Sequence, residues 1–149
     1  MENNQMGSAG QGTRSSPGKV WGPPVGMAAL ILLFSSTPGT YYPEHPDFMN
    51  NIVHLLEFGL LGFLLARALY HRLCNTRMGL FLCTTTICVS FGLLDEAHQF
   101  LVPERVFDLT DLLFDTVGTV AGAGSYILFR TMKTDSSGTG TGTTSNIDD

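Results

Sequence analysis

Asp95–Gly122 reads DEAHQFLVPERVFDLTDLLFDTVGTVAG and is the most informative stretch of the chain. It contains six acidic residues, one histidine and one arginine, and apolar runs adjoin it on both sides. Placing ionisable groups at the edge of a membrane span costs free energy, so such groups indicate a functional site unless another role explains them. The stretch therefore indicates a helical membrane fold with a polar site at the end of its spans.

The composition of the whole chain agrees with a small membrane domain. Charged residues make up 14% of the 149 residues, against roughly 25% in ordinary soluble domains. This length allows one domain. The net charge of −5 is mild and scattered, so no nucleic-acid partner is expected. The three cysteines have no metal-type spacing and are interpreted as small apolar residues.

Four apolar segments lie between two polar tails, residues 1–18 and 134–149. Both tails are too poor in apolar residues to offset their ordering entropy, so we expect them to be disordered. We predict helices at about residues 20–36, 51–70, 78–99 and 108–130. The fold class is then all-α: a polytopic bundle of four transmembrane helices over residues 19–133. Pro23 and Pro24 fall near the predicted start of the first helix, where proline is tolerated best.

Basic residues gather at one end of the predicted bundle. They precede the first helix, lie between the second and third, and follow the fourth, whereas the other two loops contain only Arg105. The positive-inside rule then places both termini in the cytoplasm, and the expected localisation is the inner or plasma membrane.

With this topology, three helices deliver polar groups to the extracytoplasmic end. These candidate catalytic residues are His54, Glu57, Asp95, Glu96, His98, Gln99 and Asp111. Arg105, in the loop before the fourth helix, is a candidate anion-binding residue because guanidinium groups grip phosphates in a bidentate way.

Acidic and small residues also repeat along the fourth predicted helix. Their spacing of 3, 4, 3, 4, 3 puts them on one seam, which we expect to pack against another helix. The members of this seam are Asp108, Asp111, Asp115, Gly118, Gly122 and Ser125. Gly118-x-x-x-Gly122 lets a neighbouring helix approach closely.

Two of these stretches resemble the VanZ-like family of integral membrane proteins. The first is Asn51–Gly62, NIVHLLEFGLLG, and the second is the Asp95–Gly122 stretch with its Pro103-x-Arg105 motif. The resemblance covers roughly residues 20–130. The family pattern has lysine at the position of Asn51 and asparagine at that of Asp115. The resemblance implies a link to low-level resistance to the glycopeptide teicoplanin, and it implies no established biochemical activity.

Several functions fit the polar end. The residues could be structural, as helix caps, ion pairs and interhelical hydrogen bonds. They could form an enzyme that uses a histidine base and a water nucleophile on a lipid-linked phosphate or head group. They could relay protons or ions in a small transporter. No cofactor is required, although carboxylate and histidine pairs on several helices also suit a divalent metal. Expected partners are membrane lipids, including a lipid-linked cell-wall precursor, and the oligomeric state stays open.

Overall fold

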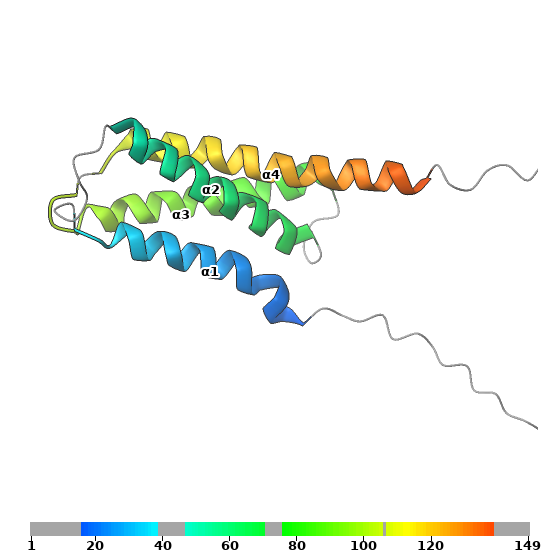
Figure 1. The fold of residues 1–149 in the computed structure, drawn as a ribbon, viewed down its shortest axis with the longest axis horizontal. Helices are drawn as coiled ribbons and strands as arrows, with labels where there is room; N and C mark the ends of the chain where they lie inside the picture. Colours follow the sequence, from blue (N-terminus) through cyan, green and yellow to red (C-terminus); the bar gives the residue numbers. More distant parts are fainter. Residues whose placement is uncertain (1–15, 39–46, 71–75, 106, 139–149) are drawn as a thin grey trace, which may run out of the picture.

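The computed structural model describes residues 16–38, 47–70, 76–105 and 107–138. Within them lie four helices and no strand: α1 (Pro17–Ser35), α2 (Asp47–Tyr70), α3 (Arg77–Gln99) and α4 (Leu109–Gly138). All four are long and apolar enough to cross a membrane. Successive helices run in opposite directions along one elongated bundle (Figure 1). The predicted all-α fold with four spans is confirmed.

The helix ends differ from the predicted ones by a few residues. α1 begins three residues before residue 20, and α2 begins four residues before residue 51. α4 continues eight residues past residue 130, so the first five residues of the expected C-terminal tail are helical. Residues 1–15 and 139–149 lie outside the described residues, and their expected disorder stays a prediction.

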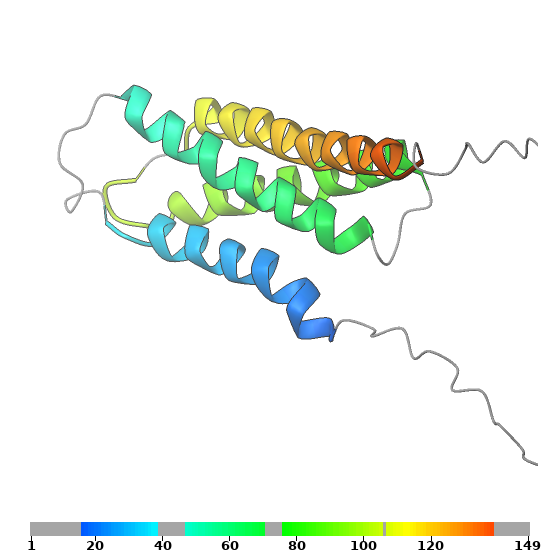
Figure 2. The same ribbon diagram turned by 45° about the vertical axis from the view of Figure 1, so that its right-hand side comes forward.

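Pro23 and Pro24 lie inside α1 rather than in its first turn. Because the helix starts at Pro17, Pro23 and Pro24 come after its first turn and remove two backbone donors there. This corrects the predicted position of the prolines. The axis of α1 changes direction near its N-terminal end (Figure 1), which is the bend that interior proline causes. α1 lies beside α2 and α3 at the edge of the bundle (Figure 2).

Glycine brings α2 and α4 into close contact. A Cβ added at Gly122 would overlap the carbonyl oxygen of Gly59, and one added at Gly118 would overlap that of Leu55. A Cβ on Gly62 of α2 would lie 2.8 Å from the carbonyl oxygen of Thr119. The predicted close approach at Gly118 and Gly122 is therefore present, and α2 supplies glycines to it as well.

The contact seam rotates along α4. Asp111, Asp115 and Gly118 are buried as the 3,4 spacing requires, but farther along the helix Thr119, Ala123 and Tyr126 take over. The two ends of the predicted seam, Asp108 and Ser125, are exposed. An ideal helix drifts by about 20° per heptad against a 3.5-residue repeat, which turns the contact toward the following residues of α4.

The bundle is apolar outside as well as inside. Its core contains Phe58, Leu65, Leu69, Leu80 and Cys88. Large apolar side chains are also exposed on all four helices, for example Leu33, Leu56, Leu94 and Leu113. So much exposed apolar surface is expected where lipid surrounds the helices.

Candidate functional site

The start of α2, the end of α3 and the start of α4 meet at one end of the bundle (Figure 1). Six polar residues are buried there: His54, Asp95, Glu96, Gln99, Asp111 and Asp115. We call His54 and the four carboxylates the acid–histidine cluster. Residues from three helices thus bring most of the candidate site residues together.

His54 of α2 faces two aspartates of α4. Its Nδ1 lies 2.9 Å from Oδ1 of Asp115, and its Nε2 lies 3.8 Å from Oδ2 of Asp111. Asp115 is fully buried beside the glycine seam. Hydrogen bonding at Nδ1 fixes the ring orientation, so Nε2 is directed toward Asp111.

Asn50, one turn before His54, supports the same arrangement. Its Nδ2 donates a hydrogen bond of 2.9 Å to Oδ2 of Asp111. Asn50 is absent from the residues predicted from the sequence. Its spacing of four from His54 places both residues on one face of α2, and this was the available signal.

The end of α3 is tied to the start of α4 through Glu96. Oε2 of Glu96 accepts a hydrogen bond of 3.0 Å from the backbone N–H of Asp108. Oδ1 of Asp108 in turn accepts one of 2.7 Å from the N–H of Thr110. Asp108 therefore caps α4 at the surface, as the structural interpretation of this residue expects.

Asp95 lies one turn before Gln99 on α3, and Nε2 of Gln99 donates to its Oδ2 at 3.3 Å. The other oxygen of Asp95 is buried without a hydrogen-bond partner among the described residues. The same is true of Oε1 of Glu96 and Oδ2 of Asp115. Buried carboxylate oxygens are normally hydrogen-bonded, paired with a charge or bound to a metal.

The charges inside the cluster do not balance. The cluster contains four buried carboxylates and a single histidine, and even a protonated imidazole offsets only one of them. Taking an unpaired carboxylate out of water is strongly unfavourable. The cluster therefore needs bound protons or a cation when the helices are packed as observed.

Three members of the cluster are close enough to share a cation. One ligand atom from each of His54, Glu96 and Asp111 lies within 4.8 Å of the other two. Divalent ions bind such nitrogen and oxygen atoms at about 2.0–2.2 Å, which requires only a small further approach. Asp115 is hydrogen-bonded to the other ring nitrogen of His54. In metal sites, a carboxylate in this position orients the histidine that binds the metal.

Two predicted site residues contact the region around the end of α1 instead. Nε2 of His98 lies 3.0 Å from Oγ of Ser36, whose hydroxyl donates to the carbonyl of Leu32 at 2.6 Å. With that hydroxyl proton engaged, His98 donates to Ser36, which is not the arrangement of a base and a serine nucleophile. Nε of Arg105 donates to the carbonyl oxygen of Thr37 at 3.5 Å.

Glu57 and Arg105 lie at the margin of the cluster. Glu57 is half-buried one turn after His54, and the charges of His54, Asp95 and Asp115 act on it. Arg105 is half-buried and is among the charges that act on Asp111. His54 makes its hydrogen bond with Asp115 of α4 and not with Glu57 on its own helix.

The fold and the cluster together define a polytopic helical membrane protein with buried acidic groups at one end of its bundle. More particularly, the chain belongs to the VanZ/LLP1 family, whose model matches residues 11–130. Neither the curated proteins nor the solved structures contain a significant match to the chain. The predicted VanZ-like membership is confirmed.

Proposed function

We propose that this protein binds or modifies a phosphate-bearing cell-envelope component at the acid–histidine cluster. The observation that carries the proposal is the convergence of His54 and four buried carboxylates, three of which keep an oxygen without a partner in the described structure. A cluster organised only for packing would be expected to satisfy these oxygens. Membership of the VanZ/LLP1 family supports a role in the envelope and, more specifically, in lowering susceptibility to teicoplanin.

The distribution of basic residues supports an extracytoplasmic position for this end. Arg67, Arg77 and Arg130 all belong to the opposite end of the helices. The positive-inside rule assigns that opposite end to the cytoplasm. A lipid-linked precursor or a phospholipid head group would then meet the cluster at the outer membrane boundary.

The carboxylates of the cluster would repel an anionic substrate. A divalent cation held by His54, Glu96 and Asp111 would offset this negative charge. Such an ion would supply Lewis-acid stabilisation of phosphate oxygens. The residues themselves have separate tasks in this proposal. Asp115 orients the His54 ring, Asn50 orients Asp111, and the backbone N–H of Asp108 orients Glu96.

In the enzymatic form of the proposal, water is the nucleophile. Asp95 is the proposed base, since its Oδ1 has no hydrogen-bond partner among the described residues. Water attacks phosphorus and gives its proton to this carboxylate, and the bond from phosphorus to the leaving oxygen breaks. The leaving oxygen then takes up this proton from the Asp95 carboxyl group, which restores the carboxylate.

A structural role for the cluster is the second candidate. It is favoured by the position of Asp115, which is fully buried on the same α4 face as Gly118. The bond between His54 and Asp115 would then mainly hold α2 against α4. In this case loss of any cluster residue lowers stability and function in parallel.

Precursor profiling tests the proposed function. We expect cells that express the protein to differ from cells without it in lipid-linked cell-wall precursors or in phospholipid head groups. Teicoplanin susceptibility measured in the same strains should fall with expression. Unchanged precursor and lipid pools would contradict the enzymatic form, and unchanged susceptibility as well would contradict the envelope role.

Metal analysis tests the cation. We expect detergent-purified protein to retain about one divalent ion per chain, as a site with three protein ligands can. Glu96→Gln should remove most of it, because an amide is a weaker ligand than a carboxylate. Asp108→Asn is the matched control, since this exposed residue loses the same charge but still caps the helix. Substoichiometric metal in the wild-type protein after supplementation with Mg²⁺, Mn²⁺ or Zn²⁺ would contradict the prediction.

A further inference from the structure

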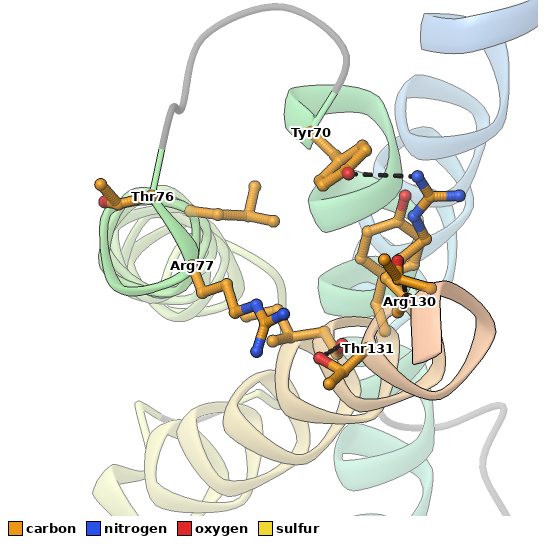
Figure 3. A pocket seen from close by; sticks show the side chains of 9 residues that line it. Tyr70, Thr76, Arg77, Arg130 and Thr131 are labelled. Carbon is orange, nitrogen blue, oxygen red and sulfur yellow. Dashed lines mark hydrogen bonds between the residues drawn. The ribbon is translucent and has the colours of Figure 1, made fainter. Parts of the chain in front are cut away.

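A second polar site lies at the opposite end of the bundle, where α2 ends, α3 begins and α4 approaches its end. A cavity of about 190 Å³ opens there between the three helices. Its lining includes Tyr70 of α2, Arg77 of α3, and Arg130 and Thr131 of α4. We call it the basic pocket, because two arginines from different helices line it (Figure 3).

Arg130 of α4 is held in place by Tyr70 of α2. Its Nη2 donates to the Tyr70 hydroxyl at 3.1 Å, and its guanidinium carbon lies 4.5 Å from the centre of the Tyr70 ring. Nε of Arg130 is buried and has no hydrogen-bond partner in the described structure. The guanidinium group is thus already oriented before any ligand binds, and its Nε–H donor has no partner in the described structure.

Arg77 reaches the same pocket from the first turn of α3. Figure 3 shows its guanidinium extending toward α4 beside Thr131. Both ion pairs among the described residues involve His54 at the other end of the bundle, so neither arginine takes part in one there. Two positive charges therefore share one cavity and leave it electropositive.

We propose that the basic pocket binds the phosphate group of an anionic phospholipid. Arg77 begins α3, and Arg130 lies four residues before the end of the apolar span of α4, so both are placed at a membrane boundary. Guanidinium groups bind phosphate oxygens through paired hydrogen bonds. Basic pockets between transmembrane helices are suited to lipid head groups on the cytoplasmic side, which is the side that the basic residues predict for this end.

Snorkelling of the two arginines to the membrane surface explains their positions less well than a binding site does. A snorkelling side chain extends its charged end into water from a single helix. Here Arg130 stacks on Tyr70 instead, and Arg77 converges on the same cavity from another helix. The volume also exceeds the roughly 30 Å³ that one water molecule occupies in the liquid, so a larger polar group can enter.

Lipid binding to the purified full-length protein tests this inference. We would measure dissociation constants of phosphatidylglycerol and phosphatidylcholine with the same acyl chains, in neutral detergent at physiological salt. Since each basic group near a membrane surface contributes about fivefold in affinity, the wild type should prefer phosphatidylglycerol by more than about tenfold. Equal affinity for the two lipids would overturn the proposal.

Matched arginine variants locate the site. Arg77→Ala should weaken binding of phosphatidylglycerol about fivefold without affecting folding, because Arg77 is an exposed residue. Arg67→Ala is the control: it removes an exposed charge at the same end that does not line the pocket, and it should change affinity by about twofold or less. Equal losses in the two variants would overturn the pocket as the site.

Two further arms complete the test. Arg130→Lys keeps the charge but loses the planar fork, so it should weaken phosphatidylglycerol binding while the melting temperature stays close to that of the wild type. Unchanged affinity in this variant would count against Arg130 as a ligand.

Inorganic phosphate is the soluble probe. Displacement of phosphatidylglycerol by millimolar phosphate would assign the pocket to free phosphate rather than to lipid.

Discussion

His54 is the residue on which the polar end is organised, because its two ring nitrogens face different aspartates. The bond from Nδ1 to Asp115 is short at 2.9 Å, whereas Nε2 stands 3.8 Å from Asp111. The first contact fixes the ring. The second leaves Nε2 available to a cation or to a proton shared with Asp111.

At this scale the pairing of His54 with Asp115 can be tested by substitution. Asp115→Ala should lower the free energy of unfolding by about 3 kcal/mol, because it removes one partner of a buried pair. Asp115→Asn should cost less than about 1 kcal/mol, since the amide oxygen still accepts a hydrogen bond from Nδ1. Denaturant titration of both variants in detergent checks this. Equal losses would contradict the assigned hydrogen bond.

The sequence identified most cluster members but not their partners. Hydropathy and topology are enough to place Glu96 and Asp111 at the same end as His54. Choosing Asp115 over Glu57 as the partner of His54 requires the rotation of α2 against α4, which local spacing does not contain. Asn50 was missed for the same reason, because its contact with Asp111 crosses between helices.

At the scale of elements, the interface between α2 and α4 is the closest contact of the bundle. Backbone atoms of Gly59 and Leu55 occupy the space that side chains at Gly122 and Gly118 would need. The same interface orients the bond between His54 and Asp115, so the packing of the two helices and the geometry of the cluster depend on each other.

Glycine substitutions on α4 test this interface. Gly122→Ala should destabilise the protein by about 3 kcal/mol or more, because its methyl group meets a backbone carbonyl that cannot change rotamer. Gly124→Ala is the control, since nothing lies within 4 Å of a Cβ at that position. It should be neutral or slightly stabilising, as alanine favours helix over glycine by about 1 kcal/mol. Melting curves of the two variants give the comparison. Similar midpoints would contradict the close approach.

The helices themselves were predictable because lipid requires long apolar segments with internally satisfied backbones. The residues at which the helices begin and end were less predictable. The apolar run of α4 stops near Phe129, yet its helix continues through polar residues to Gly138. The buried face of α4 also differs from the predicted one. A 3.5-residue pattern places Ser125 on the buried face, whereas in the structure Ser125 is exposed.

At the scale of the whole molecule, the bundle has chemically opposite ends. Buried carboxylates gather where α3 meets α4, and arginines line the pocket at the other end. Such polarity suits a protein that presents one end to each side of a membrane.

Reporter fusions test this orientation. We expect a fluorescent protein that folds only in the cytoplasm to be bright at the C-terminus. Alkaline phosphatase, which is active only outside, should be active when fused in the segment between α1 and α2. The physical reason is the positive-inside bias of the short connections. The reverse pattern would place the acid–histidine cluster in the cytoplasm and contradict the proposed access to outer envelope components.

Glu96→Gln tests most directly whether the acid–histidine cluster is a functional site or only holds the helices together. The substitution keeps the shape of the side chain and an oxygen that can accept from the N–H of Asp108. Precursor pools and the melting temperature should be measured on this variant, on Asp108→Asn and on the wild type. We predict that Glu96→Gln abolishes the change in the precursor pools while its melting temperature stays close to that of the wild type. Unchanged pools relative to wild type, or a parallel loss of stability and function, would contradict the claim.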